Sequence, residues 1–214
     1  MEAILFACDG VLVDTEGLAN DAMAALFAKA GCTLTGDDCR RRFRGLSLPD
    51  VANRLALEEG IALDPEAIAH AVHAALAAGV REVPGAADLV RKALRRNLPV
   101  CVASSGSVEK MQMTLWQAGL LRPFEGRLFS SSQVRNGKPA PDIFLYAAER
   151  LGADITRSVV IEDSLAGIRA GVSSGARVLA LCRDGLADPD LARNEGAIPV
   201  RSLAEAARHL GLVD

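Results

Sequence analysis

The feature that most constrains the fold is an alternation of short apolar segments with helical patterns, which runs from residue 84 to the end of the chain. Expected helices cover 86–96, 108–118, 142–151 and 164–173, and we interpret Trp116 and Tyr146 on them as packing residues. Expected strands cover 3–6, 99–103, 126–129, 158–161 and 176–181, with a short edge strand at 197–200. Strands separated by helices of about ten residues indicate right-handed crossovers, hence an α/β fold with a parallel sheet.

The stretch between residues 15 and 80 follows a different pattern. Ala22, Leu26 and Ala30 recur at helical spacing, and Gly31 ends that helix. Glycines and prolines separate three further short helices, and no strand pattern interrupts them. We therefore expect two units, a Rossmann-like parallel-sheet core of residues 1–14 and 81–214 and a helical insertion of residues 15–80.

Composition excludes several classes of protein. The chain has 27 acidic and 24 basic residues and a net charge of −3, which disfavours a nucleic-acid-binding protein. Asp9 and Asp14 interrupt the apolar start, and no run of about eighteen apolar residues follows, so we expect neither a signal peptide nor a membrane span. The five cysteines form no CxxC pair and indicate free thiols in a reducing cytoplasm. Three scattered histidines disfavour a zinc site or a Ser-His-Asp triad.

Polar residues lie where the expected strands end or where the next helix begins. They are Asp9, Ser104, Ser105, Gly106, Lys138, Glu162 and Asp163. Ligands of an open parallel sheet bind beyond the carboxyl ends of its strands, so we expect these residues to converge at one edge. Taken singly, each of them could serve only a turn or a helix cap.

Together these residue types favour phosphoryl chemistry. Carboxylates without histidine or cysteine suit a hard cation such as Mg²⁺. A Ser-Ser-Gly turn that opens a helix offers backbone N–H groups and a hydroxyl to an anion. Lys138 adds a point charge for the same anion. A metal, an anion cradle and a lysine are the parts that phosphoryl transfer requires.

The same segments resemble the four motifs of the haloacid dehalogenase superfamily, in its β-phosphoglucomutase-like group of sugar-phosphate phosphatases and mutases. The first motif is similar to residues 5–16 (LFACDGVLVDTE) and the second to 102–105 (VASS). The third is similar to 137–142 (GKPAPD) and the fourth to 160–167 (VIEDSLAG). The resemblance implies a helical cap inserted directly after the first motif, where residues 15–80 stand.

The resemblance also implies a role for each motif residue. Asp9 matches the general acid/base, and its backbone carbonyl matches an Mg²⁺ ligand. Ser104 matches the residue that binds a phosphoryl oxygen, and Lys138 matches the lysine that neutralises the phosphate. Asp163 matches a direct metal ligand, with Glu162 as a second ligand or a partner through water.

The cap is expected to supply specificity through a loop at residues 42–47, which resembles the family's loop that faces the core. We expect Arg44 to contact a carboxylate or a sugar hydroxyl of the substrate, Ser47 to contact another hydroxyl, and Gly45 to lie between them. In the alternative, Gly45 supplies only a turn and Arg44 only a surface charge. Across the site, Ser105 and Gly106 are expected to contact the substrate.

One position departs from the family pattern. The family's nucleophile is an aspartate two residues before the acid/base, and that position holds Ala7. A methyl group can neither attack phosphorus nor ligate Mg²⁺, so the aspartyl-phosphate route of an Mg²⁺-dependent phosphatase is lost. We predict a nearly inactive chain that still holds a phosphate ester. Because the other motifs are intact, we interpret Ala7 as a substrate-trapping substitution, the alternative being a natural non-catalytic phosphometabolite-binding protein.

The cap sequence narrows the reaction. The mutase branch carries a histidine in the first cap helix where this chain has Ala19, so hydrolysis ranks ahead of a β-phosphoglucomutase-like isomerisation, which stays an alternative. The cap loop and residues 102–107 resemble the branch that hydrolyses 6-phosphogluconate. We expect a small sugar or sugar-acid phosphate as ligand, no nucleic-acid or membrane partner, and a monomer or weak homo-oligomer.

Overall fold

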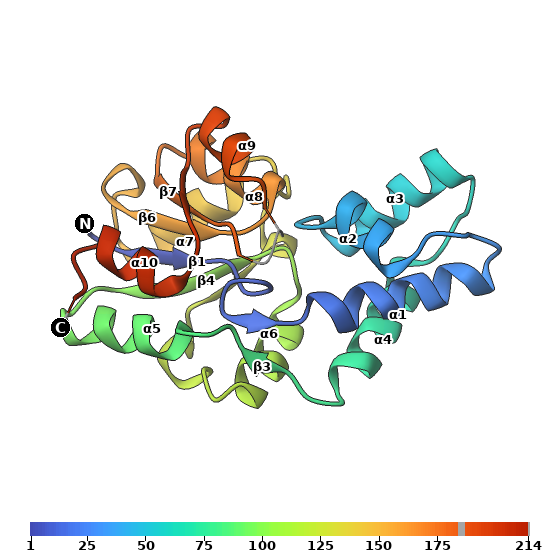
Figure 1. The fold of residues 1–214 in the computed structure, drawn as a ribbon, viewed down its shortest axis with the longest axis horizontal. Helices are drawn as coiled ribbons and strands as arrows, with labels where there is room; N and C mark the ends of the chain where they lie inside the picture. Colours follow the sequence, from blue (N-terminus) through green and yellow to red (C-terminus); the bar gives the residue numbers. More distant parts are fainter. Residues whose placement is uncertain (184–186, 214) are drawn as a thin grey trace.

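A six-stranded parallel sheet forms the centre of the molecule (Figure 1). The computed structural model describes residues 1–183 and 187–213. The strand order is β5-β4-β1-β6-β7-β8, and every neighbouring pair is parallel. The strands are β1 (Ile4–Phe6), β4 (Val100–Ser104), β5 (Leu128–Ser130), β6 (Val159–Glu162), β7 (Arg177–Leu181) and β8 (Ile198–Val200). The predicted fold class is confirmed, and β8 is the edge strand that the sequence indicates.

Helices cover both faces of the sheet because successive strand residues alternate between its faces. In β1, Ile4 and Phe6 pack with the helices of one face, while Leu5 packs with those of the other. The first face carries α5 (Ala86–Arg95), α6 (Val108–Gln117) and α10 (Leu203–His209). The second carries α7 (Asp142–Leu151), α8 (Leu165–Ser173) and α9 (Pro189–Asn194). Short 3₁₀ turns occupy Arg122–Phe124, Ser131–Gln133 and Ile155–Arg157.

The aromatic residues of α6 and α7 differ in their environment. Tyr146 packs edge to face against Phe129, with the ring centroids 5.6 Å apart. Trp116 is 72% exposed, so its interpretation as a packing residue is wrong. Met111 and Leu115 are the buried residues of α6, and Trp116 lies about 100° further round the helix from Leu115. The helix therefore turns Trp116 towards solvent.

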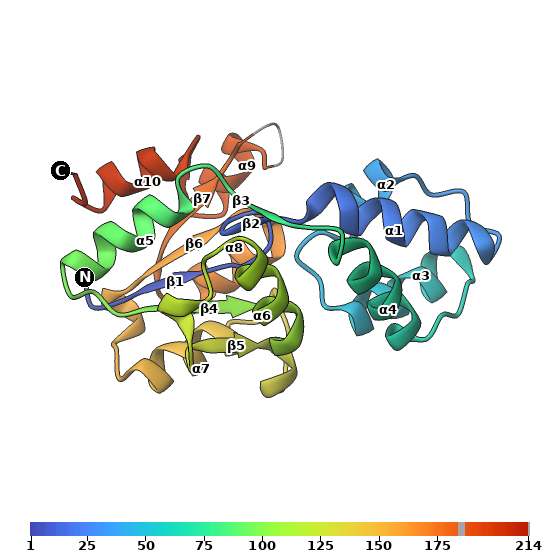
Figure 2. The same cartoon turned by 90° about the horizontal axis from the view of Figure 1, so that it is seen from below.

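Four helices form a second body to one side of the sheet, which we call the cap (Figures 1 and 2). They are α1 (Glu16–Lys29), α2 (Gly36–Phe43), α3 (Leu48–Glu59) and α4 (Pro65–Leu76). Among the described residues, no helix combines the length and the apolar character needed to cross a bilayer. The chain enters the cap from β2 (Val13–Asp14) and leaves it through β3 (Arg81–Glu82), which pair antiparallel. Both connections therefore lie side by side.

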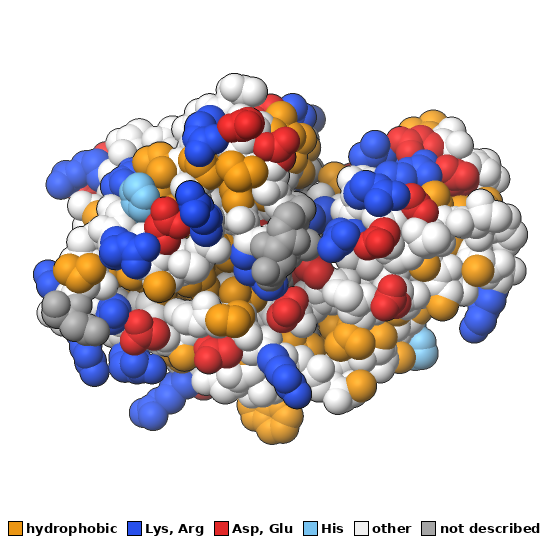
Figure 3. Space-filling view, in the orientation of Figure 1, with side chains coloured by type: hydrophobic (Ala, Val, Ile, Leu, Met, Phe, Trp, Pro, Cys, Tyr) orange, Lys and Arg blue, Asp and Glu red, His pale blue; other side chains and the backbone are white. Residues whose placement is uncertain are grey.

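The cap has its own buried residues and its own helix signals. Phe27 packs edge to face on Phe43, with centroids 6.0 Å apart, and both rings are buried. Thr35 forms a capping box at the start of α2, while Ser47 and Asp64 accept backbone N–H groups at the starts of α3 and α4. Over the face seen in Figure 3, acidic and basic side chains of core and cap are interspersed.

Candidate functional site

A cavity of about 690 Å³ lies between the carboxyl ends of the central strands and the cap. All the site residues expected from the sequence line this cavity. From the core these are Ala7, Asp9, Ser104, Ser105, Gly106, Lys138, Glu162 and Asp163, and from the cap Arg44, Gly45 and Ser47. The fold thus brings together residues from four separate segments of the core, as expected for the carboxyl edge of a parallel sheet, and from one loop of the cap.

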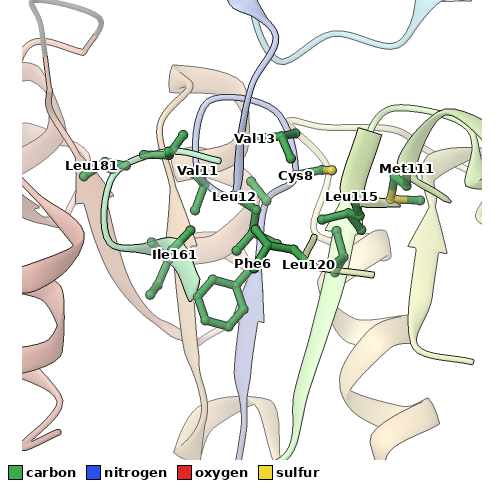
Figure 4. Packing of buried hydrophobic residues seen from close by; sticks show 14 of the residues in the cluster. Phe6, Cys8, Val11, Leu12, Val13, Met111, Leu115, Leu120, Ile161 and Leu181 are labelled. Atoms are coloured by element: carbon green, nitrogen blue, oxygen red, sulfur yellow. The ribbon is translucent and has the colours of Figure 1, made fainter. Parts of the chain in front are cut away.

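The loop that follows β1 is tightly folded, and buried side chains hold it against the core. The Leu12 N–H donates to the Cys8 carbonyl at 2.9 Å, and the Gly10 N–H donates to the Val13 carbonyl at 2.8 Å. Figure 4 shows Cys8, Leu12 and Val13 packed close to Phe6 and the residues of α6. These side chains are buried and hold the loop in place. Ala7, which lines the cavity, therefore lies at the start of a loop with a fixed backbone.

Gly10 allows the loop to approach the fourth motif. Its φ of +72° is a left-handed conformation that favours glycine. A methyl group at this position would overlap the Asp163 carboxylate. The first and fourth motifs therefore touch at a place where no side chain fits between them.

The Asp9 carboxylate in this loop accepts two side-chain hydrogen bonds. Its Oδ1 accepts from Lys110 Nζ at 2.8 Å and from Thr15 Oγ1 at 2.5 Å. Burial alone would raise the pKa of the Asp9 carboxyl, but Lys110 and Thr15 outweigh it, so the pKa lies below its usual value. Asp9 is therefore held as a carboxylate beside position 7.

Lys110 is a site residue that the sequence analysis missed. It lies in the first turn of α6, three residues after the N-cap Ser107, whose Oγ accepts the Lys110 N–H at 3.2 Å. Burial would lower the pKa of its ammonium group, yet contact with Asp9 raises it. The available signal was its place in the first turn of the helix that opens after the Ser104–Gly106 turn, because such a residue can face the ligand edge.

The turn between β4 and α6 presents backbone to the cavity. Ser104 is buried at the end of β4, and its Oγ accepts the Gly106 N–H at 3.1 Å. Ser105 Oγ donates to the carbonyl of Gly45, 2.8 Å away in the cap loop. The N-terminus of α6 therefore lies at the strand ends, where its partial positive charge favours an anion.

Lys138 and Glu162 form a buried ion pair at the same edge. Lys138 Nζ donates to Glu162 Oε1 at 2.5 Å and to the Ala103 carbonyl at 3.1 Å. Glu162 Oε2 accepts the N–H groups of Asp163 and Ser164 at 2.8 and 2.9 Å. Burial raises the pKa of Glu162, but Lys138 outweighs it and the net pKa is lowered. The ammonium group is thus fixed at the site by the core alone.

Asp163 is bound from the cap side. The Nη2 of Arg44 forms an ion pair with Asp163 Oδ2, and the Arg44 Nε lies 3.8 Å from Glu16 Oε1. Burial, with Glu162 and Glu16 nearby, raises the pKa of Asp163 to about 7 although Arg44 opposes this. The Arg44 side chain is only 9% exposed, so the alternative that it is a surface charge is wrong.

The other two residues of the cap loop have structural partners. Gly45 adopts the expected turn conformation, with φ +80°, and a methyl group there would overlap the Ser164 side chain. Ser47 caps α3, since its Oγ accepts the Asp50 N–H at 3.3 Å and donates to the Asp50 carboxylate at 2.5 Å. Its hydroxyl is therefore already engaged at the cavity wall.

The residues present fit a divalent metal poorly. Glu162 is hydrogen-bonded to Lys138 and to two backbone N–H groups, Asp163 is paired with Arg44, and the Ala7 side chain offers no oxygen. Within residues 1–183 and 187–213, no group of three His, Cys, Asp or Glu residues is arranged to hold a metal ion. Mg²⁺ prefers several oxygen ligands in octahedral geometry, which this set does not complete.

Comparison with known proteins agrees with this architecture. Residues 1–175 match a family described as haloacid dehalogenase-like hydrolases. The chain is 30% identical over 188 residues to the 6-phosphogluconate phosphatase of Escherichia coli, covering 86% of this chain and 84% of that protein. It is 29% identical over 179 residues to the phosphorylated carbohydrates phosphatase of Thermotoga maritima, covering 82% of each. A structure of a Deinococcus radiodurans family hydrolase with bound phosphate and sodium superposes with a TM-score of 0.79, 29% identity, and coverage of 100% of this chain and 97% of that one.

Proposed function

Because the chain belongs to the haloacid dehalogenase-like hydrolase family, we propose that its cavity binds a small sugar or sugar-acid phosphate monoester. In this proposal residues 1–14 and 81–214 form the catalytic core and residues 15–80 the cap. One observation carries the proposal, namely that Asp9, the Ser104–Gly106 turn and Lys138 line a single cavity. The names of the Escherichia coli and Thermotoga maritima relatives support the substrate class.

Each core residue has a task that follows from its surroundings. The phosphoryl oxygens accept hydrogen bonds from the N–H groups at the start of α6, from the Ser104 hydroxyl and from the Lys138 ammonium group. Asp9 lies two residues after position 7 and serves as the acid that protonates the leaving oxygen and the base that activates water. Its bond to Lys110 favours the carboxylate, which is the form that activates water.

Position 7 decides whether the reaction proceeds. A carboxylate there would attack phosphorus and form a covalent aspartyl-phosphate, which the water activated by Asp9 then hydrolyses. Ala7 has no nucleophile, so the chain as it stands holds the ester without turning it over. An aspartate at this position would also add an oxygen ligand next to Asp163, and we expect that form to depend on Mg²⁺.

A mutase is less well supported than a phosphatase. Ala19, which stands where the mutase branch has histidine, lines the cavity with a methyl group. No acid or base is therefore supplied at that point. A natural role in binding a phosphorylated metabolite without catalysis is the second candidate, and the neutral side chain at position 7 favours it.

The Ala7→Asp variant tests the proposal. Phosphate release should be measured with Mg²⁺ against 6-phosphogluconate and a panel of sugar and polyol phosphates. We expect a rate increase on the order of 10⁶ over the parent chain, the scale of restoring a lost nucleophile. The double variant Ala7→Asp/Asp9→Asn is the matched control and should again be inactive. A folded Ala7→Asp protein that hydrolyses no ester would contradict the phosphatase and favour the binding role.

A further inference from the structure

We propose that the Arg44 guanidinium takes the place of a divalent cation at Asp163, so that this chain binds a phosphate ester without metal. The inference rests on the phosphate site proposed above and concerns the source of its positive charge. Arg44 belongs to the cap, whereas Asp163 belongs to the fourth motif of the core. Their ion pair spans the cavity and is largely buried on both sides.

The charges around the strand ends support this assignment. Asp9 is paired with Lys110 at 2.8 Å and Glu162 with Lys138 at 2.5 Å. Asp163 is paired with Arg44. Each carboxylate of the core edge thus has its own cation from the protein.

Position 7 completes this account of charge. Glu16 is a further carboxylate near these pairs, with its Oε1 3.8 Å from the Arg44 Nε. Lys110, Lys138 and Arg44 each pair with one carboxylate of the core edge, so an aspartate in place of Ala7 would add a negative charge that none of these pairs neutralises. A divalent ion could supply the missing positive charge, whereas with Ala7 the need for it is reduced.

The cap loop delivers the guanidinium by close docking. The Gly45 backbone lies so near Ser164 that a methyl group would overlap that side chain, and the Gly45 carbonyl accepts from Ser105 Oγ at 2.8 Å. These two contacts hold Gly45, and with it the preceding residue Arg44, against the core. A guanidinium keeps its charge throughout the ordinary pH range and has N–H groups on several sides. It can therefore hold Asp163 with one edge and a phosphoryl oxygen with another.

A second consequence follows for metal binding. Because Arg44 occupies Asp163 Oδ2, a divalent ion that used this oxygen would have to displace the guanidinium. Metal binding and loop docking therefore compete, and each weakens the other by the same factor.

Calorimetric titration of the parent chain with inorganic phosphate tests the inference. We expect dissociation constants that agree within about twofold in EDTA and in millimolar Mg²⁺, and no saturable binding of Mg²⁺ alone in that range. Arg44→Gln should weaken phosphate binding in EDTA by about tenfold or more. Arg40→Gln is the matched control, because Arg40 lies on the neighbouring helix in an exposed pair with Asp37, and it should leave the affinity unchanged.

Arg44→Lys keeps the positive charge but loses the planar set of N–H donors, so it should bind phosphate with intermediate affinity. This variant also provides a test if Arg44→Gln fails to fold. Phosphate binding by the parent chain that requires Mg²⁺ would overturn the inference, as would an Arg44→Gln protein with parental affinity. If Ala7→Asp hydrolyses esters while the parent needs Mg²⁺ to bind phosphate, this inference alone fails. If Ala7→Asp is inert while the parent binds phosphate in EDTA, only the phosphatase proposal fails.

Discussion

The core edge and the cap loop hold their charged residues in different ways. Lys138 is fixed by Glu162, by the Ala103 carbonyl and by the ring of Phe144, 4.9 Å from its Nζ, all within the core. Arg44 instead extends from the cap to a partner in the other unit. The core edge is therefore arranged before a ligand arrives, whereas the contribution of Arg44 exists only while the loop is docked.

The packing of the cap also differs from that of the core edge. The cap packs its own helices around residues such as Phe27 and Leu55, and two adjacent strands connect it to the core. A unit with its own buried residues can shift as a body when few contacts hold it. In the proposed function, phosphate recognition therefore falls to the core edge, and the cap loop adds the contribution of Arg44.

The largest effect is expected when Lys138, the cation held within the core, is removed. Lys138→Met would leave the Glu162 carboxylate buried without its cation, at a cost of about 3–5 kcal/mol in the free energy of unfolding. Urea denaturation measures the loss. Arg91→Met, which breaks an exposed pair with Asp88, should cost less than about 1 kcal/mol. Equal losses for the two variants would show that the core edge is not fixed by this pair.

A smaller effect is expected where α8 touches Glu162. A methyl group in Gly167→Ala would overlap the Glu162 carboxylate, and overpacking of this kind costs about 1–3 kcal/mol. Gly17→Ala in α1 of the cap meets open space and should instead stabilise the protein by about 0.5–1 kcal/mol. Thermal unfolding of both variants gives the comparison. A Gly167→Ala protein as stable as the parent would mean that the core edge can rearrange.

Among the three site variants, the smallest loss of stability, about 1 kcal/mol, is expected in the cap loop for Gly45→Ala. Its methyl group would overlap Ser164, and we expect the loop to undock rather than the protein to unfold. Gly60→Ala is the matched control, since its φ of +70° gives similar strain with open space around it. Calorimetry should show a several-fold weaker phosphate affinity for Gly45→Ala only. Equal phosphate affinities of Gly45→Ala and Gly60→Ala would show that phosphate binding does not depend on docking of the cap loop.

The strands and the core motifs could be predicted because their signals are local. A short apolar segment followed by a polar residue identifies a strand and its ligand edge wherever the sheet lies. Asp9 and Ser104 were found in this way and Lys138 by its place ahead of the next helix, and all three line one cavity. Side-chain direction on helices is harder, because apolar and polar residues alternate on α6. Trp116 was misplaced and Lys110 was missed for this reason.

By itself, the amino-acid sequence determined the strands of the parallel sheet, the helices α1 to α8, the four segments that resemble the family motifs and the alanine at position 7. Each of these is a property of neighbouring residues. Only the tertiary structure decided that Arg44 reaches Asp163 and Lys110 reaches Asp9, because these partners are 119 and 101 positions apart. Charge pairing at such separations depends on how the cap and the helices pack against the sheet, and no local pattern encodes it.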